Sequence, residues 1–151
     1  MRNRRGFTLM DVVLTIAITG IVGAMALPRL KEPAAGLQVR SAKQATSQMI
    51  VVARSASISS GNEARFIRSG NVVRVVLDSS GTWITLASKN LNTEYGVAYS
   101  VSSGGRDTVR FDARGIAIGL SGAQWLRFTK GAAVDSVCVS RMGKVAPRSC
   151  S

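Results

Sequence analysis

The sequence of 151 residues contains no histidine, and its eight acidic residues are scattered along the chain without a close pair. Histidine is the commonest general base and a frequent metal ligand, and positioned carboxylates are the usual substitute for it in acid–base chemistry. The remaining residues form no recognisable nucleophile, metal or cofactor motif. The sequence therefore predicts that the chain is not an enzyme and that it carries no cofactor and no metal.

Cysteine is almost absent, with only Cys138 and Cys150, both near the C-terminus. In an exported protein such a pair usually forms a disulfide, whereas in a cytosolic protein the two thiols are more often free. The compartment therefore decides the state of the cysteines, and the N-terminus is the part of the sequence that indicates the compartment.

Because acidic residues are few, the chain is strongly basic. Twenty Lys and Arg residues face eight Asp and Glu residues, which gives a formal charge of +12. Removal of residues 1–6 would leave 17 basic and 8 acidic residues, a formal charge of +9. This charge attracts polyanions such as nucleic acid, anionic lipid or acidic protein surfaces, but it does not select one of them.

The N-terminus combines a basic leader, residues 1–6, with a run of 21 residues, 7–27, whose only charge is Asp11. As a helix this run would be roughly 31 Å long, enough to cross the hydrocarbon core of a bilayer. The leader arginines predict a cytoplasmic N-terminus, with the chain beyond the span outside. A secretory signal peptide cut after Ala26 is the alternative. The full length of the apolar run argues against it, and so does Asp11, since an acid in a span costs about 2.5–3.5 kcal/mol.

The segment Gly6-Phe7-Thr8-Leu9-Met10-Asp11 resembles the prepilin peptidase site of type IV pilins and type II secretion pseudopilins. The resemblance implies cleavage between Gly6 and Phe7 by prepilin peptidase and N-methylation of Phe7. It also implies that Asp11 pairs with the α-amino group of a neighbouring subunit during assembly. The family usually has glutamate here, so Asp11 keeps the charge on a shorter side chain. Pro28 lies where pilin helices commonly carry a helix-kinking proline.

Beyond the span, Pro33 and Gly36 predict a kink or short linker over residues 29–36. A second helix is predicted over residues 37–59, because apolar residues recur there at steps of three and four. This stripe consists of Ala42, Ala45, Met49, Val52 and Ala56. Gly61 and Asn62 then supply a helix stop. We expect the stripe to pack against a sheet.

After residue 61 the sequence changes to short β-rich runs separated by Gly, Ser, Asn and Asp. The predicted strands are residues 64–68, 72–77, 83–86, 97–101, 108–112, 125–129 and 136–140. One helix followed by a meander implies an α+β domain with the helix laid on antiparallel strands, and this agrees with the "lollipop" architecture of pilins. The predicted divisions are a leader (1–6), a transmembrane helix (7–27), a kink and amphipathic helix (28–61) and a β-rich globular domain (62–151).

Three later segments resemble the GspH/FimT-type minor pseudopilins: residues 52–56 (VARSA), residues 109–115 (VRFDARG), and residues 137–140 (VCVS) with Gly143 and Lys144. This resemblance implies a minor subunit of a type II secretion or type IV pilus machine, placed near the fibre tip and assembled with other pilin subunits. It also implies a single pass through the bacterial inner membrane with the globular domain outside, in the periplasm or at the cell surface. In that compartment we expect Cys138 and Cys150 to form a disulfide.

The alternative function is a pilus-displayed receptor for DNA uptake. Some FimT-like pilins bind DNA through a C-terminal Gly-Arg-x-Arg element, and the comparable place here reads Gly143-Lys144-Val145-Ala146. The candidate DNA-binding residues are therefore Arg141, Lys144 and Arg148. Because Ala146 takes the place of the second basic residue, we favour the interpretation of a solvated basic tail.

Overall fold

The computed structural model describes residues 9–102 and 105–146, and for residues 26–32 it describes the helical backbone alone. The chain divides into two compact units, Met1–Ala34 and Ala35–Ser151. One long helix, α1 (Leu9–Ser60), contributes residues to both units.

The helical assignment of α1 runs without a break through Pro33 and Gly36. Of the two alternatives predicted over residues 29–36, the short linker is therefore wrong, and the kink stays a prediction. A proline inside a helix removes one hydrogen bond and kinks the helix, but long helical runs on both sides can keep the backbone helical through it. Pro28 also lies within α1, and the kink expected there stays a prediction. The helix ends where the sequence indicates, at Gly61, which has a φ of 67° in the left-handed region.

The buried face of α1 in the second unit follows the predicted spacing but is displaced at its C-terminal end. Its residues are Val39, Ala42, Ala45, Thr46, Met49, Ile50, Ala53 and Ser57. Val52, which was expected on this face, is 42% exposed, and Ala56 is only half-buried. A strict alternation of three and four residues has a repeat of 3.5 and drifts by about 20° per heptad from a straight α-helix. Ala53 and Ser57 therefore replace Val52 and Ala56.

Two antiparallel sheets follow α1. Sheet A has the order β3-β2-β1-β5-β6 and sheet B the order β4-β7-β8-β9. The strands of sheet A are β1 (Ala64–Ser69), β2 (Val72–Ser79), β3 (Thr82–Asn90), β5 (Thr108–Phe111) and β6 (Ala117–Ile118). The strands of sheet B are β4 (Ala98–Val101), β7 (Gln124–Lys130), β8 (Ala133–Val139) and β9 (Val145–Ala146). All seven predicted strands are present, and the antiparallel α+β prediction is confirmed.

Three short elements were not predicted: β6, β9 and the helix α2 (Leu91–Tyr95). The two strands have two residues each. α2 is defined by its caps, because the Asn90 side chain accepts hydrogen bonds from the backbone N–H groups of Asn92 and Thr93. Gly96 ends the helix in the left-handed conformation. Elements this short show no periodicity in the sequence, and only such capping chemistry could indicate them.

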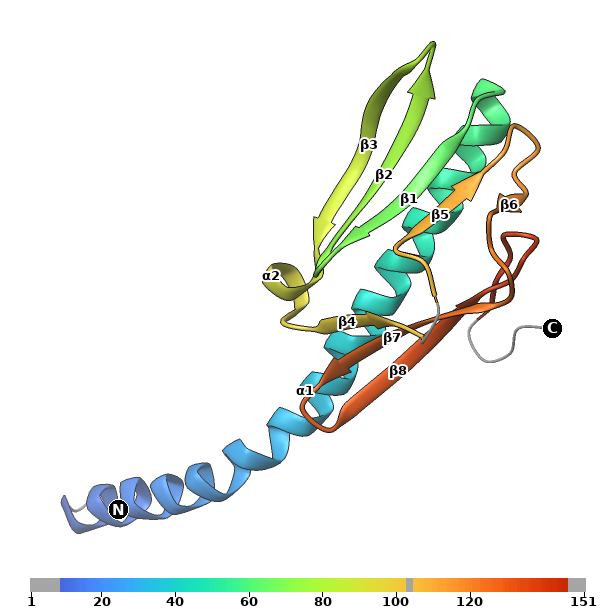
Figure 1. The fold of residues 1–151 in the computed structure, drawn as a ribbon. Helices are drawn as coiled ribbons and strands as arrows, with labels where there is room; N and C mark the ends of the chain where they lie inside the picture. The colour runs from blue at the N-terminus through green and yellow to red at the C-terminus, as the bar shows by residue number, and fades with distance from the viewer. Residues whose placement is uncertain (1–8, 103–104, 147–151) are drawn as a thin grey trace, which may run out of the picture. The chain divides into compact units, whose positions relative to one another are not determined.

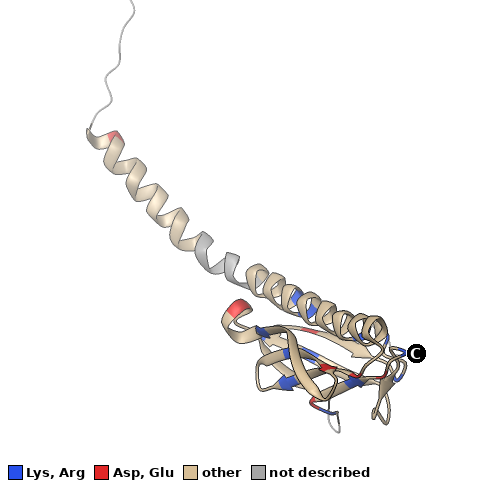
Figure 2. Ribbon diagram, turned by 90° about the horizontal axis from the view of Figure 1, so that it is seen from above, with Lys and Arg blue, Asp and Glu red and all other residues tan. Residues whose placement is uncertain are grey.

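The core of the second unit lies between the C-terminal half of α1 and the two sheets. Both views show this half of the helix on one side of the strands (Figures 1 and 2). The largest fully buried side chains are Phe66, Phe111, Phe128, Ile50, Leu91 and Leu126. They come from α1, α2 and strands of both sheets, so the helix and the two sheets share one apolar cluster.

Candidate functional site

The N-terminal half of α1, residues 9–25, exposes apolar side chains on all sides. Ten large apolar residues of this segment are 46–83% exposed. They are Leu9, Met10, Val12, Val13, Leu14, Ile16, Ile18, Ile21, Val22 and Met25. Figure 2 shows the charge pattern of the helix, and Asp11 is the only charged residue of this segment. A helix that is apolar on all sides requires apolar surroundings.

None of the described helical stretches combines the length and the apolar character that a membrane span needs.

Of the predicted N-terminal site residues, Asp11 is described and is a residue of α1. Gly6 and Phe7 lie outside the described residues, so the cleavage and methylation site stays a prediction. Asp11 is thus placed at the start of the apolar segment, and its role in assembly stays a prediction as well.

The predicted C-terminal basic residues Arg141 and Lys144 share one tight turn between β8 and β9, and both are exposed. The Ser140 and Gly143 backbone N–H groups donate to the carbonyls of Lys144 and Ser140, each at 2.9 Å. Gly143 has a φ of 75°, and a Cβ atom there would lie 2.7 Å from the Phe111 ring. The turn is therefore fixed against the core. No acid in the described part of the chain pairs with Arg141 or Lys144, while Arg148 lies outside it.

Cys138 is fully buried in β8. Its expected partner Cys150 lies outside the described residues, so the disulfide stays a prediction.

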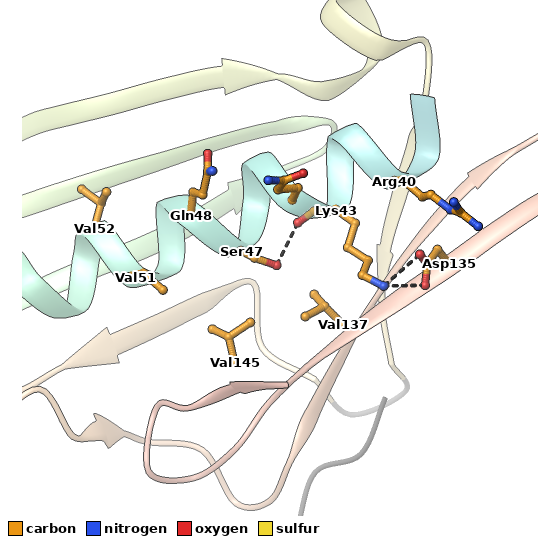
Figure 3. A pocket seen from close by; sticks show the side chains of 10 residues that line it. Arg40, Lys43, Ser47, Gln48, Val51, Val52, Asp135, Val137 and Val145 are labelled. Atoms are coloured by element: carbon orange, nitrogen blue, oxygen red, sulfur yellow. Dashed lines mark hydrogen bonds and ion pairs between the residues drawn. The ribbon is translucent and has the colours of Figure 1, made fainter. Parts of the chain in front are cut away.

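A groove of ≈ 1110 Å³ runs between the C-terminal half of α1 and the β8–β9 hairpin (Figure 3). Its lining residues are Arg40, Lys43, Gln44, Ser47, Gln48, Val51, Val52, Asp135, Val137 and Val145. Valines from both sides form an apolar part, and the charged residues gather at one end. This groove was not predicted, because its two walls are about 90 residues apart in the sequence and only the fold joins them.

At the charged end of the groove, the Lys43 Nζ donates to both carboxylate oxygens of Asp135, at 2.9 and 2.8 Å. Burial raises the pKa of Asp135, but the hydrogen bonds from Lys43 and from the Ser136 N–H outweigh it and leave the pKa below its ordinary value. Arg40, at the same end, adds a further positive charge. The pair fastens α1 to β8 and leaves this end of the groove with a net positive charge.

A second charge network lies on the face of sheet A that points away from α1. Glu63 accepts from Arg110 Nε and Nη2, at 2.7 and 2.6 Å, and from Arg65 Nε at 2.6 Å. The hydrogen bond from Arg110, opposed by burial and reinforced by Arg65, lowers the pKa of Glu63 to about 2. The Arg65 guanidinium also stacks on the Trp83 ring, 3.9 Å from its centroid. The alternation of strand residues could have placed Arg65 and Arg110 on one face, but the cross-strand register could not be read from the sequence.

No group of three or more metal-ligating side chains occurs among the residues that the structure describes. No protein-family model matches the chain, and no curated protein matches its sequence.

Solved structures, in contrast, define the class of fold. A long N-terminal helix packed on antiparallel sheets is a type IV pilin-like fold, and the chain has that fold. It is similar to the type IV minor pilin FimU of Pseudomonas aeruginosa, with a TM-score of 0.59 and 15% identity over 74% of this chain and 88% of that chain. A second crystal form of FimU gives a TM-score of 0.56 and 16% identity, covering 74% of this chain and 99% of that chain. At this identity the likeness concerns the fold, and the closer resemblance to GspH/FimT proteins stays a prediction.

Proposed function

We propose that the chain is a minor pilin or pseudopilin of a type IV pilus or type II secretion machine and assembles through the N-terminal half of α1. The observation that carries this proposal is the exposed apolar helix of residues 9–25, with Asp11 at its start, on a pilin-like fold. Burying one large apolar side chain contributes about 1.5–3 kcal/mol. Ten such side chains give this helix a strong tendency to leave water and to pack against the same segment of neighbouring subunits.

Before assembly, the same segment would hold the subunit in the bacterial inner membrane. In this proposal residues 7–27 form the span, the leader faces the cytoplasm, and the globular domain lies outside. Prepilin peptidase cuts between Gly6 and Phe7, and Pro28 allows the helix to bend between the span and the domain. A Cys138–Cys150 disulfide would then fix the C-terminal tail on sheet B. The subunit enters the fibre near its tip.

Asp11 would supply the register of assembly. A carboxylate in apolar surroundings needs a cation or a set of hydrogen-bond donors to offset its desolvation. The free α-amino group created by cleavage before Phe7 is a cation that each processed neighbour presents at the same depth. Pairing between this amine and Asp11 would align adjacent subunits.

The test is incorporation into fibres sheared from cells that express the full-length protein. Asp11→Ala should reach the membrane at wild-type level but be missing from the fibre fraction. Asp11→Glu should be incorporated, because it keeps the charge. Glu94→Ala, which removes an exposed acid of the globular domain, is the matched control and should be incorporated. Normal incorporation of Asp11→Ala would contradict the assembly role, and absence of the wild-type chain from every fibre fraction would contradict the proposed function.

A DNA receptor is the second candidate function. It is supported by the position of Arg141 and Lys144 on one exposed, rigid turn without acidic partners in the described chain. Ala146 of β9 takes the place of the second basic residue of the DNA-binding element, so the first proposal is the better supported.

A further inference from the structure

Among the described residues the two sheets have four edge strands, and β3 is the longest of them. β6 and β9 have two residues each and β4 has four, whereas β3 has nine. In the described chain β3 pairs with β2 alone, and Figure 1 shows it at the outer side of sheet A. Very short edge strands are a common protection against unwanted pairing. β3 is not short in this way, and the other unpaired stretch, residues 133–137 of β8 beyond the two-residue β9, carries the charge of Asp135.

The sequence of β3 is suited to accept another strand. Residues 82–88 contain no charge and no proline, two features that block an edge, and no glycine, which would weaken the strand. Trp83, Ile84 and Leu86 are 40%, 47% and 44% exposed. The only irregularity is at Leu86, where the register skips one residue opposite Val75 and Val76. This bulge leaves the first four residues of β3 as a regular, uncharged edge.

The outward face of this edge is held in place by the Arg65–Trp83 stack. Arg65 lies opposite Val76 of β2, and Trp83 lies opposite the next outward residue, Asp78. The stack must therefore cross β2 above Val76, which explains why Val76 is buried on the outer face of the sheet. An incoming strand would bind a preformed edge. Its binding would therefore cost little side-chain conformational entropy on this face.

The charges of the domain indicate an acidic partner. Residues 35–146 contain 14 basic and six acidic residues. Five of these acids form ion pairs, and the sixth, Asp78, accepts from the Gly81 N–H. Arg74 of β2 is exposed, and no acid of the described chain pairs with it. Its cross-strand neighbour on β3 is the small Ser88. A strand added beside Ser88 would lie two strand spacings, about 9.6 Å, from Arg74, which extended Arg and Glu side chains can bridge.

We propose that the open edge of β3 accepts an extended strand of a different subunit, with an acidic side chain placed beside Ser88 to pair with Arg74. The identification of the partner as a neighbouring subunit rests on the proposed function; the edge and its charge preference do not. A second copy of this chain fits less well, because it would bring another domain of the same positive charge and another Arg74 to the interface. Backbone hydrogen bonds would supply the affinity, and Arg74 the preference for an acid.

The experiment uses the full-length protein in detergent and two fluorescent nine-residue peptides. Both alternate valine and threonine; one carries glutamate at two threonine positions and the other carries lysine there. Fluorescence anisotropy should show that the glutamate peptide binds at least about tenfold more tightly than the lysine peptide. Hydrogen exchange should become slower in residues 82–86 when the glutamate peptide binds. Ile84→Lys should abolish binding, and Arg74→Glu should reverse the preference.

Two matched variants control for the change in charge. Val134→Lys alters an exposed valine of β8, and Arg127→Glu alters an exposed arginine of β7 without an acidic partner in the described chain. Both should bind the glutamate peptide like wild type. The proposal is overturned if neither peptide binds, if both bind equally, or if binding survives Ile84→Lys. It is also overturned if exchange of residues 82–86 slows with protein concentration alone, since a second copy is then the occupant.

These outcomes are independent of the fibre test. Peptide binding by a chain that never enters fibres would keep the edge proposal and remove the proposed function. Incorporation into fibres without peptide binding would keep the proposed function and remove the edge proposal.

Discussion

Lys43 on α1 and Asp135 on β8 are 92 residues apart in the sequence and form a two-point ion pair, with both N–O distances below 3 Å. The pair is partly shielded from water, at 21% and 31% side-chain exposure. The pair links side chains of the helix that would enter the fibre and of the sheet that carries the basic turn.

Removal of one partner of this pair should destabilise the domain. Asp135→Asn leaves the Lys43 ammonium half-buried without its counter-charge, and we expect a loss of about 1–3 kcal/mol in unfolding free energy. Lys43→Met with Asp135→Leu should recover part of this loss, because neither charge is then left alone. Urea unfolding at neutral pH measures both. An unchanged midpoint for Asp135→Asn would show that the pair contributes nothing to stability.

Glu63 should make the stability depend on acid pH. Its pKa falls from an ordinary value of 4.5 to about 2 in the folded protein. A carboxylate with a depressed pKa stabilises the fold above the unfolded value, and this contribution is lost as the pH falls from about 4.5 to about 2. Glu63→Gln should therefore lower the stability at neutral pH and flatten its decline over this range. Parallel pH profiles for wild type and Glu63→Gln would contradict the assignment.

Tyr99 should tolerate loss of its hydroxyl. The ring is buried and stacks on Phe128 with the centroids 5.2 Å apart, and the hydroxyl oxygen has no hydrogen-bond partner in the described chain. Burial raises the pKa of this phenol. Because an unpaired buried hydroxyl costs about 1–3 kcal/mol, Tyr99→Phe should be neutral or stabilising in thermal unfolding. Tyr99→Leu is the control and should destabilise by removing the stack. A clear loss with phenylalanine would show that the hydroxyl is bonded in solution.

DNA binding should be diffuse. The basic chain will bind duplex DNA at low salt in any case, since each phosphate contact contributes about −0.9 to the slope of log affinity against log salt. We expect Arg141→Glu with Lys144→Glu to reduce affinity and slope by no more than Arg74→Glu with Arg127→Glu, which reverses two exposed charges elsewhere. Abolition by the first pair alone would support a specific receptor on the β8–β9 turn and contradict diffuse binding.

The sequence predicted the α+β fold, the end of α1 and every strand longer than two residues, because these depend on local patterns. Gly61 ends the helix and the strand runs are separated by turn residues, so neither requires knowledge of distant contacts. A short linker over residues 29–36 was the wrong alternative, because Pro33 and Gly36 weaken a helix locally while the helix continues on both sides. Val52 was misplaced because a pattern of threes and fours does not distinguish a repeat of 3.5 from one of 3.6.

Among the candidate sites, too, features set by a local pattern could be predicted and features set by distant contacts could not. Asp11 could be singled out because a charge inside an apolar run is visible in the sequence alone. The Lys43–Asp135 pair and the groove beside it depend on which strand lies under the helix, and no local pattern specifies that. The uncharged run in β3 was readable from the sequence. Its meaning was not, because only the strand order shows that β3 is an edge.

Processing and assembly as a pilin-like subunit require a cut between Gly6 and Phe7, so the mature N-terminus is the decisive measurement. Mass spectrometry of the membrane-extracted protein should find a chain that begins with N-methylated Phe7. Gly6→Val should leave uncut precursor, because the peptidase site needs a minimal side chain before the cut. A mature chain that begins at Leu27, the product of signal peptidase acting after Ala26, would contradict the account.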